Sequence, residues 1–254
     1  MNSHTWPLRE NVRYLSVLML CVLCLVFDSR QLLFLLASWI SLIVIFGNVR
    51  HLPHSSGLLY ALRMTLYFLP YALPAVIFLT SGFTFNARAA IGCAASLLLY
   101  GVWVKVNYRA LRVLLSKDAA ASAPKEPKLR IILMIYNSAG ASVCEELFFR
   151  AFIFSIDIPV FALVPVSAAL FVASHYMLPW GGRFTRSDHL NQLLTGLACS
   201  LIFIYSGSVI PCVLLHTLMN TPTILMYARR FDRHYLRKEY YDTKQINALD
   251  ELNI

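Results

Sequence analysis

Eight apolar runs, each of about the length that crosses a lipid bilayer as one helix, dominate this sequence. They are residues 12–27, 32–47, 58–80, 89–106, 131–156, 160–177, 190–206 and 207–228. A spanning helix needs about 20 mostly apolar residues, within a range of roughly 17–25. The first two runs are the shortest and lie close together, which fits a tight helical hairpin. We therefore predict an all-α protein, a polytopic transmembrane helical bundle of about eight spans.

The composition supports the same class of protein. Hydrophobic residues make up 58% of the chain and charged residues 14%, whereas soluble domains average about 45–50% apolar and about 25% charged residues. Because a soluble domain cannot bury so many apolar side chains, a soluble, disordered or collagen-like protein is excluded. The net charge of +9 does not indicate a nucleic-acid partner, because the basic residues cluster between the apolar runs, as in juxtamembrane loops.

The basic residues also predict the orientation of the chain. With the N-terminus inside and eight alternating spans, 18 of the 22 Lys and Arg residues fall on inner segments and only two on outer ones. The remaining two, Arg63 and Arg150, lie within runs. Arg63 is near the inner end of its run, where the side chain can extend to the interface. We expect a multi-pass protein of a prokaryotic cell membrane with both termini cytoplasmic.

The stretch 107–130 separates four runs from the next four. Its core, 118–130, is rich in alanine and charged residues, and we interpret it as a cytoplasmic linker. Residues 1–117 then form a four-span scaffold half, and residues 131–228 form a four-span catalytic half. Residues 229–254 form a cytoplasmic tail.

Ionisable residues inside apolar runs are informative because a charge at the bilayer centre costs roughly 2.5–3.5 kcal/mol. Eleven of the 13 acidic residues lie in loops or tails. The remaining two acids, Glu145 and Glu146, lie in an apolar run of the second half. The runs of this half also contain the polar residues Arg150, His175, His216 and Asn220. A single pair of this kind is often structural. Their concentration in three of four consecutive runs predicts an intramembrane functional site.

Helical spacing sorts these residues into groups. Glu146 and Arg150 are four positions apart with the acid first, which favours an ion pair on one face. Glu145 is rotated by about 100° from Glu146, so it is left without that partner. The same spacing recurs in the pairs Phe171–His175 and His216–Asn220. We therefore expect one neutralised and one free glutamate.

Three short motifs in this region resemble those of the family of CAAX proteases and bacteriocin-processing enzymes, also called the Abi or CAAX prenyl protease 2-like family. They are E-E-x-x-x-R at 145–150, F-x-x-x-H at 171–175 and H-x-x-x-N at 216–220. Each motif alone is weak, but the three occur in order and each lies in an apolar run. The resemblance covers about 131–228 and implies a multi-pass intramembrane endopeptidase.

The resemblance also implies roles for individual residues. Glu145 would be the catalytic glutamate, with His175 as its partner in activating water, and His216 and Asn220 would stabilise the oxyanion. The supporting residues would be Glu146, Arg150 and Phe171. This chemistry is coherent by itself, because peptide hydrolysis needs a base for water and hydrogen-bond donors for the oxyanion. Histidine and asparagine can both donate such bonds.

A zinc ion is the competing mechanism, since two His and one Glu form a catalytic zinc set in other proteins. Its ligands would be Glu145, His175 and His216. However, the histidines come from different helices, the chain has no H-E-x-x-H motif, and asparagine is a poor zinc ligand. We therefore favour a glutamate-type mechanism without a cofactor and keep zinc as the alternative.

Two other classes of function remain. The chain could be a non-catalytic membrane immunity or binding protein that keeps the fold. It could also be a proton-coupled transporter, since intramembrane Glu, Arg and His mark proton relays, although transporters more often show repeats or broken helices in both halves. For the protease, the expected partners are membrane lipids and a peptide or protein with a membrane-proximal cleavage site. No nucleic acid is expected.

Overall fold

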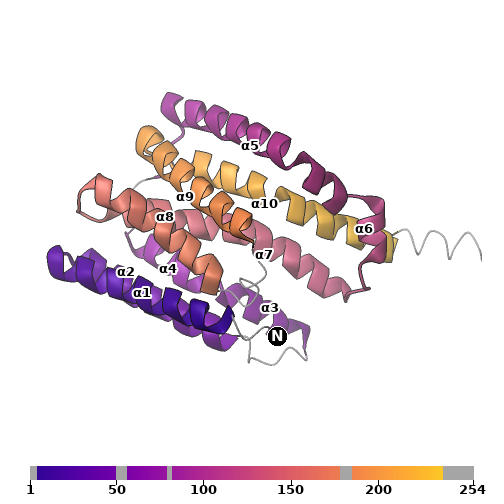
Figure 1. Ribbon diagram of the computed structural model, residues 1–254, viewed down its shortest axis with the longest axis horizontal. Helices are drawn as coiled ribbons and strands as arrows, with labels where there is room; N and C mark the ends of the chain where they lie inside the picture. The colour runs from indigo at the N-terminus through magenta and orange to yellow at the C-terminus, as the bar shows by residue number, and fades with distance from the viewer. Residues whose placement is uncertain (1–4, 50–55, 79–81, 178–184, 237–254) are drawn as a thin grey trace, which may run out of the picture.

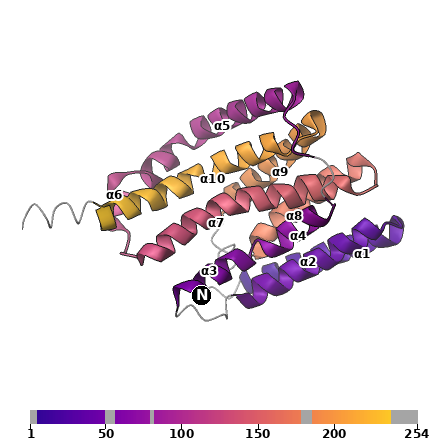
Figure 2. The ribbon, with the colours of Figure 1, turned by 180° about the vertical axis from the view of Figure 1, so that it is seen from behind.

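The computed structural model describes residues 5–49, 56–78, 82–177 and 185–236. Within these ranges every regular element is a helix, and the long helices lie side by side in a bundle (Figures 1 and 2). The predicted all-α class is therefore confirmed. Most of the expected tail, 237–254, lies outside the described residues, as do Arg50 and Arg183 of the basic count.

Each predicted run coincides with a helix or with a broken pair of helices. The first four runs correspond to α1 (Thr5–Val26), α2 (Arg30–Asn48), the pair α3 (Gly57–Leu66) and α4 (Leu69–Phe78), and α5 (Ala87–Leu114). The last four correspond to α7 (Lys128–Glu146), α8 (Val160–Met177), α9 (Arg186–Ser206) and α10 (Ile210–Phe231). The apolar runs therefore located the helices, with ends that differ by several residues.

Fewer helices than expected are apolar and long enough to cross a membrane. Among the described residues four qualify, namely α2, α5, the helical stretch 128–155 and α8, and the bent pair α3–α4 would be a fifth. The long helices α1, α9 and α10 do not meet this combined test of length, hydropathy and charge. The number of about eight spans is therefore not confirmed and, like the orientation, stays a prediction.

The third run is broken into α3 and α4, which meet at a bend of 53°. Pro70 follows the break directly, and Pro74 lies inside α4. Proline has no backbone N–H to donate, and its ring disfavours a helical residue before it. The two prolines therefore explain why this run is not one straight helix.

The predicted linker 107–130 is partly helical. α5 continues to Leu114, and a short helix, α6, occupies Lys117–Ser122. The Ser116 side chain caps α6 by accepting a hydrogen bond from the backbone N–H of Ala119. Serine is a favoured N-cap and alanine the strongest helix former. The division of the chain into a scaffold half and a catalytic half remains a prediction.

An aromatic cluster joins α4 to the end of α7, where the helix widens into a π-helical segment, Leu147–Phe152. The ring of Tyr71 on α4 lies 5.5 Å from the ring of Phe148 and 5.7 Å from that of Phe149. All three side chains are buried. Short π-helical turns are frequent at functional sites, and this one fixes the backbone directly after Glu146.

Candidate active site

Glu146 and Arg150 form a buried ion pair at the end of α7. The Nε atom of Arg150 lies 3.1 Å from Oε2 of Glu146, and both side chains are fully buried. Arg150 also donates a hydrogen bond of 3.0 Å from Nη2 to the carbonyl of Gly196 on α9. Its guanidinium carbon lies 5.0 Å from the ring centroid of Phe171 on α8. The predicted i,i+4 ion pair is therefore confirmed, and it ties the end of α7 to two other helices.

The second carboxylate oxygen of Glu146 holds a histidine of α10. Nδ1 of His216 lies 2.8 Å from Oε1 of Glu146. Because a carboxylate can only accept, Nδ1 carries the proton of this hydrogen bond. The ring is therefore fixed in orientation, and its Nε2 is turned toward Glu145 at 4.0 Å.

Glu145 lies between two imidazole rings. Its Oε2 atom is 4.0 Å from Nε2 of His175 and 4.0 Å from Nε2 of His216. The Glu145 side chain is only 9% exposed, and among the described residues its Oε2 has no hydrogen-bond partner. Distances of 4.0 Å are too long for direct hydrogen bonds and suit a bridging water molecule. The expected contrast between a paired and an unpaired glutamate is therefore present.

His175 is held by its own helix. Its Nδ1 atom lies 2.8 Å from the carbonyl oxygen of Phe171, one turn earlier. Since a carbonyl only accepts, Nδ1 is the donor, and Nε2 is the nitrogen of the neutral ring that has acceptor character. The Phe171 ring packs against both histidine rings, at centroid distances of 4.7 Å to His175 and 5.5 Å to His216. Phe171 thereby orients both imidazoles.

Asn220 is placed differently from the other predicted site residues. Its Nδ2 atom donates to the carbonyl of Ser138 at 3.1 Å and to Oγ of Ser142 at 3.0 Å, both on α7. The amide group therefore joins α10 to α7 at about one turn before Glu145. The structure brings the two glutamates, the arginine and the two histidines together. The amide of Asn220 donates its hydrogen bonds to α7 instead of to any of these five residues.

Several contacts of the site involve residues that sequence reasoning did not select. Gly196 accepts from Arg150, and Ser138 and Ser142 accept from Asn220. Backbone carbonyls carry no sequence signal, and serine in an apolar helix is common. A weak signal was present for Ser142, because it lies one turn before Glu146 on the same helix.

The alternative zinc set fits in donor chemistry but not in spacing. Zinc bonds to N and O of about 2.0–2.2 Å require ligand atoms roughly 3.3–3.5 Å apart, whereas Glu145 Oε2 lies 4.0 Å from each imidazole. In the described part of the chain, three ligand atoms lie within 4.8 Å of one another only in Glu146, Cys199 and Cys212.

That second group has other contacts. Glu146 is already neutralised by Arg150. The thiols of Cys199 and Cys212 each donate to the other's backbone carbonyl, at 3.9 Å and 3.2 Å. These bonds connect α9 to α10 behind the ion pair. We therefore interpret the two cysteines as packing residues rather than metal ligands.

Comparison with known proteins addresses the same region. Residues 127–222 match the family described as Rce1-like, type II CAAX prenyl endopeptidase Rce1-like. The match covers under half of the chain but contains all three motifs and every predicted site residue. No curated protein and no solved structure matches the chain. The resemblance inferred from the three motifs is confirmed, because residues 127–222 are similar to the Rce1-like family of type II CAAX prenyl endopeptidases.

Proposed function

We propose that this protein is a membrane endopeptidase that hydrolyses a peptide bond in a membrane-associated peptide or protein tail, with Glu145 and His175 activating the attacking water. The observation that carries the proposal is the position of Glu145, whose buried Oε2 faces two imidazole Nε2 atoms at 4.0 Å each. The family match supports the reaction class.

In the proposed first step, the Glu145 carboxylate takes a proton from a water molecule that also donates a hydrogen bond to Nε2 of His175. The oxygen of that water then attacks the carbonyl carbon of the scissile peptide bond. A base positioned in this way contributes typically about 10²–10⁴-fold to a rate. His175 suits the accepting role because its Nδ1 is held by the Phe171 carbonyl.

In the second step, the oxyanion of the tetrahedral intermediate needs a donor. His216 can supply it when its ring carries protons on both nitrogens. The Nδ1–H group then keeps its hydrogen bond to Oε1 of Glu146, and the Nε2–H group donates a hydrogen bond to the oxyanion. Collapse of the intermediate breaks the C–N bond, and the leaving amine takes the proton held by Glu145.

Asn220 can join this oxyanion site only by exchanging an existing hydrogen bond. Both of its present acceptors, Ser138 and Ser142, lie on α7. We therefore propose His216 as the principal donor. Asn220 would assist after its bond to Ser142 is released, or otherwise hold α10 in register with α7.

The proposed activity can be tested by comparing peptide termini in membrane fractions. Cells would express the native chain, Glu145→Gln or the control Glu126→Gln, which removes an acid far from the site. We expect one or more membrane-associated substrates to stay uncleaved with Glu145→Gln and to be cleaved with the other two. Identical termini in all three samples would contradict the proposal.

The metal-free form of this mechanism makes a separate prediction. Purified protein in detergent should keep at least about 80% of its turnover after prolonged treatment with a strong chelator, because Glu145 and His175 activate water without a metal. Turnover before and after chelation, with metal content measured on the same sample, checks this. A loss that added zinc restores would favour the set Glu145, His175 and His216 instead.

A further inference from the structure

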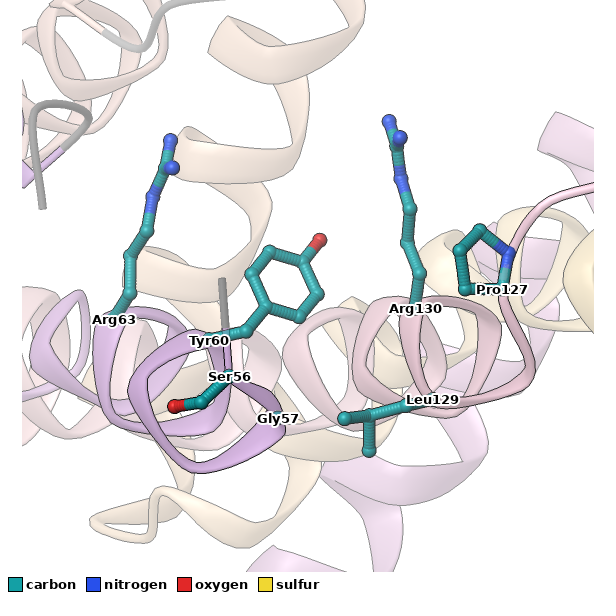
Figure 3. A pocket seen from close by; sticks show the side chains of 7 residues that line it. All are labelled: Ser56, Gly57, Tyr60, Arg63, Pro127, Leu129 and Arg130. Atoms are coloured by element: carbon teal, nitrogen blue, oxygen red, sulfur yellow. The ribbon is translucent and has the colours of Figure 1, made fainter. Parts of the chain in front are cut away.

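A pocket of about 440 Å³ lies between the start of α3 and the start of α7. Its walls include Tyr60 and Arg63 of α3 and Leu129 and Arg130 of α7. The two helices approach closely here, because a Cβ atom added at Gly57 would lie 2.7 Å from Cδ2 of Leu129. Figure 3 shows Arg63 and Arg130 extending in the same direction, with the Tyr60 ring between them.

The two arginines leave most of their donors available. In the described ranges Arg63 has no ion pair, and Arg130 has only a loose one, with Nε 3.6 Å from Glu126 and a side chain that is 55% exposed. Glu126 is shared with Arg230 at 3.9 Å, so it cannot neutralise this region. Two guanidinium groups at one pocket favour an anion with several oxygen atoms, such as a phosphate group.

Exposed apolar side chains flank the pocket on the same two helices. Leu58 is 80% exposed and Leu62 50% on α3, while Leu129 is 41% and Ile132 45% exposed on α7. Both the α3–α4 pair and the stretch that begins with α7 are candidate membrane spans. A soluble anion would need only the basic groups, whereas basic groups beside exposed apolar side chains fit a headgroup with acyl chains.

We propose that this pocket binds the phosphate headgroup of an anionic phospholipid, with Arg63 and Arg130 on the phosphate and the acyl chains along the exposed leucines. The site is separate from the candidate active site. Arg130 and Glu145 lie on the same helix, roughly 22 Å apart at about 1.5 Å per residue. The proposal does not depend on the protease activity.

The test uses the full chain, purified in detergent and delipidated, with native mass spectrometry to measure the binding of phosphatidylglycerol and of phosphatidylcholine with the same acyl chains. The pocket variant is Arg63→Gln/Arg130→Gln. The matched control is Arg109→Gln/Arg112→Gln, which removes two exposed arginines of α5. Melting temperatures without lipid verify that both variants fold, and Arg130→Gln alone serves as a second variant because that side chain is largely exposed.

We expect native protein to bind phosphatidylglycerol about tenfold more tightly than phosphatidylcholine. The pocket variant should lose that preference, Arg130→Gln should lose part of it, and the control should stay within about twofold of native protein. Equal losses in pocket and control variants would overturn the proposal. Displacement of the lipid by millimolar inorganic phosphate would assign the pocket to a soluble anion. A peptide with a free carboxyl terminus could also bind more strongly than its amidated form. If that difference is lost when Arg63 is substituted, the pocket binds a peptide and the lipid proposal is overturned.

Discussion

Glu145→Gln should abolish peptide hydrolysis while leaving the folded bundle intact. Glutamine keeps the shape of the side chain but cannot take a proton from water, so we expect turnover to fall by about 10²–10⁴-fold. Folding should be unaffected, because Oε2 of Glu145 has no hydrogen-bond partner among the described residues. Turnover and melting temperature, measured on one purified sample with one substrate, check both parts.

The matched control for this variant is Glu126→Gln, which makes the same chemical change two residues before the start of α7. Glu126 contacts Arg130 and Arg230 only at 3.6 Å and 3.9 Å. Its substitution should change turnover by less than about twofold. If Glu145→Gln cleaves at the native rate, Glu145 is not the base and the proposed mechanism fails.

Substitution of Glu146 or Arg150 should instead destabilise the protein. Breaking a buried ion pair by removing one partner leaves an uncompensated charge, which typically costs about 3–5 kcal/mol. In Glu146→Gln the Arg150 guanidinium is left buried, and His216 loses the acceptor of its Nδ1 proton. We expect low folded yield, a lower melting temperature and little activity for Glu146→Gln and for Arg150→Met.

Two further variants make this prediction specific. Glu146→Gln/Arg150→Met removes both charges and should cost less than the sum of the single changes, because neither charge is left unpaired. Glu126→Gln breaks an i,i+4 pair with Arg130 that is partly exposed, and such pairs contribute about 1 kcal/mol or less. If Glu146→Gln is stable but inactive and Glu145→Gln unfolds, the roles of the two glutamates are reversed.

The helices were predictable because each apolar run reports directly on burial in lipid or in a bundle. Their irregularities were harder to predict. The bend between α3 and α4 has a sequence cause in Pro70, but the π-helical turn at Leu147–Phe152 has none that could be recognised. The helix α6 was not predicted, because it has only six residues and lies outside the apolar runs from which the helices were inferred.

In the candidate site, contacts within one helix were likewise predictable, whereas contacts between helices were not. The Glu146–Arg150 pair was predictable because residues four apart on a helix share a face whatever surrounds it. The contact of His216 with Glu146 was not, because it joins residues 70 positions apart. The three motifs indicated which residues belong together, but not that the amide of Asn220 would be directed at Ser138 and Ser142.

The sequence by itself determined a helical membrane protein, the segment that matches the endopeptidase family and the pairing of charges within one helix. These properties follow from hydrophobicity and from the 3.6-residue period, which act locally. Only the tertiary structure decided that His175 and His216 both lie 4.0 Å from Oε2 of Glu145, and that the carbonyl of Gly196 accepts a hydrogen bond from Arg150. Such contacts depend on how helices rotate and approach one another, and that packing is fixed by many side chains acting together.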